Sequence, residues 1–147
     1  MTWLERMAAF RAGCDPSEIT NAIPYAVFLG LSLERSDQGL LCRMRYADQN
    51  VGNPSLPALH GGTLGALLES AAVFQLLWEV EMASLPKIIN ITAQYLRSAR
   101  PVDTLARSII TKHGRRVVAV RAEAWQDDPA RPVAIANAHF LIRPAGE

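Results

Sequence analysis

The sequence is poor in the residues that charged partners and metal ions require. It has two cysteines, three histidines and a formal net charge of +1, without a long run of Lys or Arg. Proteins that bind nucleic acid or an anionic membrane surface carry basic patches, so the sequence supports neither role. Cys14 and Cys42 stand in unrelated contexts, and no His, Cys or carboxylate cluster has the spacing of a metal site. We therefore expect reduced thiols, no metal and no cofactor.

Long apolar runs are also missing. The first six residues include an acid and an aromatic residue and lack the apolar core of a signal peptide. No run approaches the roughly 18 apolar residues of a membrane-spanning helix, because Glu69, Ser70 and Gln75 interrupt the longest one. These absences predict a soluble, cytoplasmic protein without a membrane contact.

The stretch from residue 59 to residue 72 organises the chain. It reads as a loop that runs into a mostly apolar helix, which we predict over residues 62–80. His60, Gly61 and Gly62 stand where that helix begins, so their backbone N–H groups have no partner inside it. Such groups lie at the positive end of the helix dipole and are suited to binding a negatively charged oxygen.

Glu69 is an isolated carboxylate among the leucines and alanines of this helix. A buried carboxylate is costly unless it has a partner or a task. It follows Gly62 by seven residues, on a similar face but roughly 10 Å further along the axis. Donors to a developing oxyanion must lie within about 3 Å of it, so one carbonyl cannot meet both Gly61 and Glu69 of the same helix. If the stretch is catalytic, we expect two chains to share the site through antiparallel copies of the helix.

The rest of the chain predicts a sheet around this helix. A first helix is expected over residues 2–12, with Thr2 and Glu5 forming a capping box, and the apolar residues 22–30 form a lid-like turn or a wall over a pocket. Strands rich in Val, Ile, Thr and aromatic residues are expected at 31–36, 39–46, 87–98, 104–112, 116–126 and 133–142.

Short turn sequences join the four strands after the helix, which predicts an antiparallel meander. The order of elements predicts an α+β fold, an antiparallel β-sheet wrapped around one long central helix. We predict a single domain over residues 1–147, in which an N-terminal helix and apolar segment, 1–30, precede the core, 31–147.

Three sequence features together resemble the hotdog-fold acyl-CoA thioesterases, in particular their PaaI-like and 4-hydroxybenzoyl-CoA branches. They are His60-Gly61-Gly62 followed by Glu69, the strand that contains Tyr95-Leu96-Arg97, and the turn Gly114-Arg115. The resemblance covers roughly residues 30–142. It implies a hotdog fold and an enzyme that hydrolyses an acyl- or aroyl-CoA to the free acid and coenzyme A. It also implies a homodimer or homotetramer.

The resemblance implies roles for four catalytic residues. Glu69 matches the family's carboxylate, which acts as general base on water or as nucleophile on the thioester carbonyl. Gly61 matches the glycine whose N–H polarises that carbonyl, and His60 matches the histidine that shapes the loop and is a candidate contact of the thioester. Asn53 resembles an upstream polar residue near the carbonyl or the attacking water, although it precedes His60 by seven residues where the family has six. The PaaI-like branch usually carries Asp at the position of Glu69.

Five further residues are candidates for substrate binding: Gly62, Ser70, Arg97, Arg115 and Arg116. Guanidinium groups bind phosphates well, so the arginines can meet the phosphates of coenzyme A. Each candidate also has a structural interpretation, as a cap, a packing residue or an ordinary exposed arginine. Residues 22–29, Leu76 and Trp78 are expected to line a pocket for an apolar acyl group, aromatic or of medium length.

The sequence leaves alternatives open. A non-catalytic hotdog protein would bind acyl-CoA or acyl carrier protein, and a purely structural dimer would leave Glu69 paired and the groove filled. A hotdog dehydratase or hydratase is less favoured, because the histidine-and-aspartate pair of such enzymes is not evident around the helix.

Overall fold

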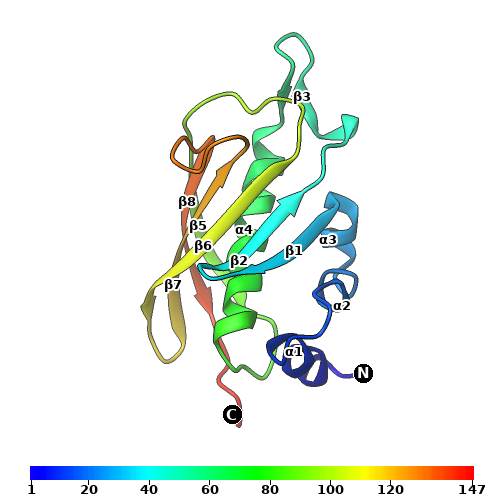
Figure 1. Cartoon of the computed structure of the whole chain (residues 1–147). Helices are drawn as coiled ribbons and strands as arrows, with labels where there is room; N and C mark the ends of the chain where they lie inside the picture. The colour runs from blue at the N-terminus through cyan, green and yellow to red at the C-terminus, as the bar shows by residue number, and fades with distance from the viewer.

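One long helix lies against a six-stranded antiparallel sheet in the computed structural model, which describes residues 1–147 (Figure 1). The helix is α4 (Gly61–Glu79). The strands of the sheet are β1 (Leu31–Ser36), β2 (Gly39–Met44), β5 (Lys87–Tyr95), β6 (Thr104–His113), β7 (Val117–Trp125) and β8 (Ala134–Leu141). The predicted α+β class and hotdog architecture are confirmed, and α4 begins one residue before its predicted start.

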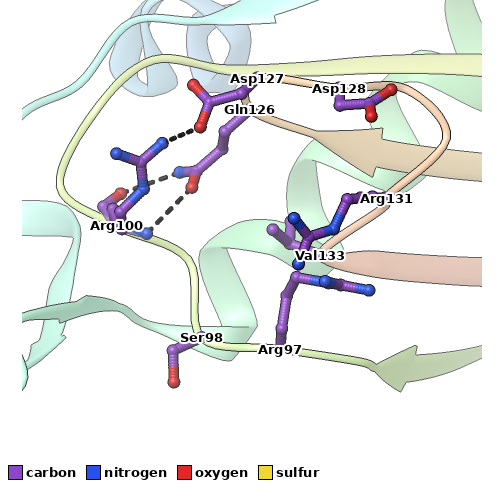
Figure 2. Close-up of a pocket in the computed structure, with 8 residues that line it drawn as sticks. All are labelled: Arg97, Ser98, Arg100, Gln126, Asp127, Asp128, Arg131 and Val133. Carbon is purple, nitrogen blue, oxygen red and sulfur yellow. Dashed lines mark hydrogen bonds and ion pairs between the residues drawn. The ribbon is translucent and has the colours of Figure 1, made fainter.

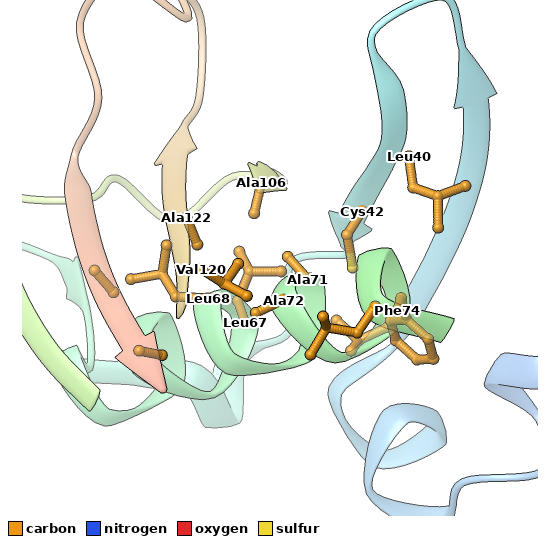
Figure 3. Packing of buried hydrophobic residues seen from close by; sticks show 14 of the residues in the cluster. Leu40, Cys42, Leu67, Leu68, Ala71, Ala72, Phe74, Ala106, Val120 and Ala122 are labelled. Carbon is orange, nitrogen blue, oxygen red and sulfur yellow. The ribbon is translucent and has the colours of Figure 1, made fainter. Parts of the chain in front are cut away.

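Alternation of apolar residues on the strands and helical spacing on α4 produce the core. Leu67, Leu68 and Ala71 of α4 are buried and point towards Cys42 of β2 and Val120 of β7 (Figure 3). The strands contribute small buried side chains to the helix-facing side of the sheet, including Ala106, Ala122, Ala124, Ala134, Ala136 and Ala138. Small side chains on the sheet let the helix approach closely, so that its leucines fill the space between the layers.

The strand order corrects the predicted meander. The order is β1-β2-β6-β7-β8-β5, so β5 pairs with β8 and not with β6. Residues 96–103 carry the chain from one side of the sheet to the other, past the start of α4, where Leu59 N–H donates to Ala99 O at 2.9 Å. Three strand spacings are only about 14 Å, which eight residues can span. A turn sequence marks where a strand ends, but it does not decide which strand becomes its neighbour.

The N-terminal segment forms three helices, α1 (Trp3–Arg11), α2 (Ser17–Thr20) and α3 (Pro24–Leu29). The capping box is present, since Glu5 N–H donates to Thr2 Oγ1 and Thr2 N–H donates to Glu5. Phe10 of α1 packs edge-on against Trp78 near the end of α4, with ring centroids 5.2 Å apart. The segment predicted as a lid-like turn or a wall is therefore helical at α3 and belongs to the packed structure.

A small hairpin precedes the central helix. After a 3-10 turn at Asp48–Asn50, β3 (Val51–Asn53) pairs with β4 (Ala58–Leu59) apart from the main sheet. None of the helices has both the length and the apolar character needed to cross a membrane.

Candidate active site

The start of α4 has one backbone donor that is not used. His60 is the N-cap, and its Nδ1 accepts the Gly62 N–H at 2.8 Å. The N–H groups of Thr63 and Leu64 both donate to His60 O. Gly61 N–H is therefore the one donor of the first turn without a partner in the chain. In a neutral His60 ring whose Nδ1 accepts, the proton lies on Nε2 and is available to a further acceptor.

The surrounding backbone holds this turn in place. His60 N–H donates to Asn50 O at 2.7 Å, and the backbone of Gly52 lies so close that a Cβ there would meet His60 Cα at 2.7 Å. Tyr95 of β5 donates its hydroxyl proton to Gly61 O at 2.9 Å. The start of α4 is thus fixed by three segments. The sequence indicates Tyr95 only as part of a strand motif, because its contact with Gly61 spans 34 positions of the chain.

Glu69 lies on the side of α4 that faces away from the sheet. It is only partly buried, and no hydrogen bond or ion pair joins its carboxylate to another residue of the chain. The burial raises the pKa of Glu69 above its ordinary value of 4.5, because desolvation disfavours the charged form. A carboxylate with a raised pKa and no partner is a stronger base than a paired one.

Glu69 and Ser70 open onto an apolar cleft of about 430 Å³. The other eight lining residues come from α3 and the residue before it, from α4, and from the α4–β5 connection: Ile23, Tyr25, Ala26, Ala66, Val73, Phe74, Leu85 and Pro86. The predicted wall over residues 22–29 is thus confirmed in part. Leu76 and Trp78 do not line the cleft, because Leu76 is fully buried and Trp78 packs against Phe10.

Gly61 and Glu69 are separated along the helix. They are eight residues apart on α4, which is about 12 Å along the axis. Within one chain, the free N–H and the free carboxylate cannot reach the same carbonyl group.

Comparison with known proteins gives the family of the chain. Residues 52–141, more than half of the chain, match the family model for the acyl-CoA thioesterase N-terminal domain. The chain belongs to the hotdog acyl-CoA thioesterase family. Its enzymatic class is therefore thioester hydrolase, as the resemblance implies.

Solved structures share the fold of this thioesterase over nearly its full length. A protein from Chromobacterium violaceum is 39% identical and has a TM-score of 0.78, over 97% of this chain and 99% of that chain. A phenylacetic acid degradation-related protein from Ralstonia eutropha is 24% identical with a TM-score of 0.75, over 92% and 98% of the two chains. A thioesterase enzyme from Staphylococcus aureus is 18% identical with a TM-score of 0.72, over 83% and 100%. No curated protein matches the sequence of this thioesterase.

The thioesterase also has a polar cleft of about 240 Å³ lined by three arginines (Figure 2). Arg100 is paired with Asp127, while Arg97 donates only its Nε proton, to Pro132 O at 3.1 Å. Arg131 of the β7–β8 loop has no side-chain partner in the chain and lies beside Arg97. Arg131 was not predicted, because only the fold brings it next to Arg97. The cleft lies at the end of the sheet where α4 begins, since Ala99 bonds to Leu59.

The other predicted residues, Arg115, Arg116 and Asn53, do not line the arginine cleft. Arg115 and Arg116 lie at the β6–β7 turn, at the opposite end of the sheet (Figure 1). Both pair with Glu147, at 2.8 and 3.1 Å. Asn53 lies in the β3–β4 hairpin, exposed, and its Oδ1 accepts the Ser55 N–H at 3.0 Å. No three His, Cys, Asp or Glu side chains of the thioesterase lie close enough together to hold a metal ion.

Proposed function

We propose that this thioesterase hydrolyses an acyl- or aroyl-CoA with an apolar acyl group, in a site shared by two copies of the chain. The observation that carries the proposal is the unpaired Glu69 carboxylate at an apolar cleft, on the side of α4 that the sheet leaves uncovered. Gly61 N–H, the unused donor at the start of α4, polarises the thioester carbonyl bound beside Glu69 of the second copy.

Two chemical routes use the same groups. As general base, Glu69 removes a proton from water, the water oxygen attacks the carbonyl carbon, and the C–S bond breaks as the thiolate leaves and takes up the proton. As nucleophile, Glu69 attacks the carbonyl carbon itself and expels the thiolate, and water then hydrolyses the resulting anhydride. In both routes the negative charge that develops on the carbonyl oxygen is stabilised by Gly61 N–H. Both end with the free acid and coenzyme A.

Two surface features support a shared site. Strand β5 is an edge of the sheet and exposes Ile88 and Ile89, although unpaired edge strands of this length are usually covered. The uncovered side of α4 carries small residues, Gly65 and Ala66, before Glu69. Antiparallel pairing of β5 with its copy sets the two α4 helices side by side in opposite directions, so that the start of one approaches the middle of the other. A homodimer is the smallest active unit in this proposal, and the alternative homotetramer would pair two such dimers.

The remaining candidate residues serve the same reaction. His60 holds the first turn of α4 through its bond to Gly62 N–H and presents Nε2 to the thioester. A side chain at Gly62 would meet His60 Nδ1 at 3.0 Å, so the glycine leaves room for this contact. Ser70, next to Glu69 in the cleft, binds the acyl end or the water. The side-chain amide of Asn53 turns towards the water only if the hairpin gives up its bond to Ser55.

The arginine cleft is the proposed place for the phosphates of coenzyme A. The free guanidinium ends of Arg97 and Arg131 lie at the same end of the molecule as Gly61. A planar guanidinium group binds phosphate oxygens in pairs. Arg115 and Arg116 can contact the substrate only where assembly of the chains brings the β6–β7 turn to a site, after their release from Glu147.

Steady-state hydrolysis of a panel of aromatic and aliphatic acyl-CoAs, followed with a thiol-reactive dye, tests the proposal. Replacement of Glu69 by Gln or Ala is expected to lower kcat/KM by about 10²- to 10⁴-fold, because the base is lost. The matched control is Glu81→Gln, which removes an exposed carboxylate that has no partner. Size-exclusion chromatography checks that all variants keep the wild-type oligomer.

The results distinguish the alternatives. Unchanged hydrolysis by a correctly assembled Glu69→Gln variant would refute the role of Glu69. Binding of acyl-CoA without turnover by the wild type would instead favour a binding protein, or an enzyme that acts on acyl carrier protein thioesters.

A further inference from the structure

The wall of the apolar cleft comes partly from outside the region that the family model matches. The matched region begins at residue 52, whereas Ile23, Tyr25 and Ala26 belong to the N-terminal segment. The opposite wall is the side of α4 that carries Val73 and Phe74. One side of the cleft therefore lies inside the region that the family model matches, and the other side lies in the N-terminal segment outside it.

The N-terminal wall is a fixed element of structure. Pro24 begins α3, and Gly30 ends it with a left-handed φ of +67°, a conformation that glycine adopts without strain. Ala26 and Leu29 anchor α3 in the core, at 2% and 3% exposure. Tyr25 is 55% exposed, so its ring borders the cleft on one side and solvent on the other.

The cleft extends from Glu69 towards the end of α4. Val73 and Phe74 follow Glu69 by four and five residues, which places them roughly 6–8 Å further along the axis. This distance suits one aromatic ring or an aliphatic chain of about six carbons. Seven of the ten lining residues are hydrophobic, and Glu69 is the only charged one. An acyl group that ends in a second carboxylate would be repelled by Glu69 and left without a cation.

We propose that the N-terminal wall, residues 23–26, bounds the acyl cleft and sets the length of the acyl group that the enzyme accepts. Tyr25 closes the cleft at its solvent side, and Ile23 limits its depth. This inference rests on the proposed function, since it takes the bond cleaved at Glu69 as the start of the acyl group. The ligand class is an uncharged apolar acyl group of short to medium length, or a single aromatic ring.

The test is a series of straight-chain acyl-CoAs from acetyl to dodecanoyl, with phenylacetyl-CoA and succinyl-CoA added. For the wild type, kcat/KM is expected to rise about fourfold with each methylene buried, until the cleft is full. Tyr25→Ala should move the optimum to longer chains, because it opens the wall. Ile23→Phe should move it to shorter chains, because it fills the cleft. Succinyl-CoA should be a poor substrate for all three.

Two controls isolate the wall. Val27→Ala changes a residue of α3 that is as exposed as Tyr25 but does not line the cleft, so the optimum should stay. Tyr25→Phe keeps the ring and should also keep the optimum. Equilibrium binding of the same acyl-CoA series to the Glu69→Gln variant gives a second readout that needs no turnover.

Failure of this inference differs from failure of the proposed function. The same optimum in the wild type, Tyr25→Ala and Ile23→Phe, with hydrolysis or binding intact, would overturn the role of the N-terminal wall alone. If hydrolysis were insensitive to Glu69, the proposed mechanism would fall, while a shift in the binding profile would still support the wall.

Discussion

The two sides of α4 differ in almost every physical respect. Towards the sheet, Leu64, Leu67 and Leu68 are at most 3% exposed and fill the core. On the opposite side, Gly65 and Glu69 remain partly exposed, and the carboxylate has no partner. The first side stabilises the chain, whereas the second is the side for which we propose the chemistry and the contact with a second copy. A single helix can serve both purposes because its two sides are in contact with different surroundings.

The largest effect on stability is expected from the sheet side. Leu68→Ala removes a fully buried side chain and should lower the free energy of unfolding by about 2–5 kcal/mol. Urea denaturation measures the loss, and kcat per folded molecule should stay at the wild-type value. The control is Leu4→Ala, at a leucine that is 52% exposed. If Leu68→Ala left stability intact and reduced kcat, the division between the two sides would be wrong.

A large side chain on the side of α4 that carries Gly65 and Glu69 should weaken the proposed dimer. Gly65→Phe places a large ring where the second helix packs in the proposed dimer, so that dimer should dissociate at least tenfold more readily, and activity should fall with it. Gly65→Ala is the matched control, because a Cβ there meets only the Tyr95 hydroxyl, at an ordinary 3.5 Å. Alanine is also a better helix former, by up to about 1 kcal/mol. Analytical ultracentrifugation gives the dissociation constants. A dimeric Gly65→Phe variant with full activity would place the interface elsewhere.

Two variants of His60 distinguish its role as the N-cap of α4 from a direct contact with the thioester. His60→Ala removes the acceptor of the Gly62 N–H and should cost about 1 kcal/mol of stability. His60→Asn keeps an N-cap acceptor but lacks the Nε2 proton. Thermal unfolding and kcat/KM are measured for both variants. A fall in kcat/KM of about tenfold in His60→Asn, with stability retained, would support contact with the thioester. Full activity in His60→Asn would show that the His60 side chain acts only as the N-cap of α4.

The smallest expected effect is a pH dependence of the free energy of unfolding, caused by the Glu69 carboxyl group. Its pKa is raised in the folded state, so between pH 4.5 and that higher pKa the folded chain holds a proton that the unfolded chain has lost. The stability contribution of this group is therefore present below the window and declines as pH rises through it. Glu69→Gln should raise Tm by a few degrees above the window and change it little below.

Activity should follow the opposite trend over the same interval, because only ionised Glu69 can act as base or nucleophile. The acid limb of kcat/KM should lie above pH 4.5. Melting curves and rates of the wild type across this range, with Glu69→Gln as the control for Tm, test both trends. An acid limb at or below the ordinary carboxylate pKa would contradict the desolvated Glu69 of the structure.

Local signals in the sequence were sufficient for the first helix, the long helix and the six strands of the main sheet, whereas α2, α3 and the β3–β4 hairpin were not predicted. The capping box at Thr2, the two leading strands and the long helix all follow from patterns within a few residues. The position of His60 and Gly61 at the helix start follows from the same kind of signal. The partner of β5 does not follow from a local signal, because the connection from β5 to β6 is long enough to let β5 pair with either β6 or β8.

The sequence by itself therefore determined the α+β class, the central helix and the presence of Glu69 on it, because helical periodicity and capping are local properties. Only the tertiary structure decided that Tyr95 holds Gly61, that Arg131 lies beside Arg97, and that α3 lines the apolar cleft. These contacts join residues that are far apart in the chain. They are selected by how the layers pack together, which no short stretch of sequence encodes.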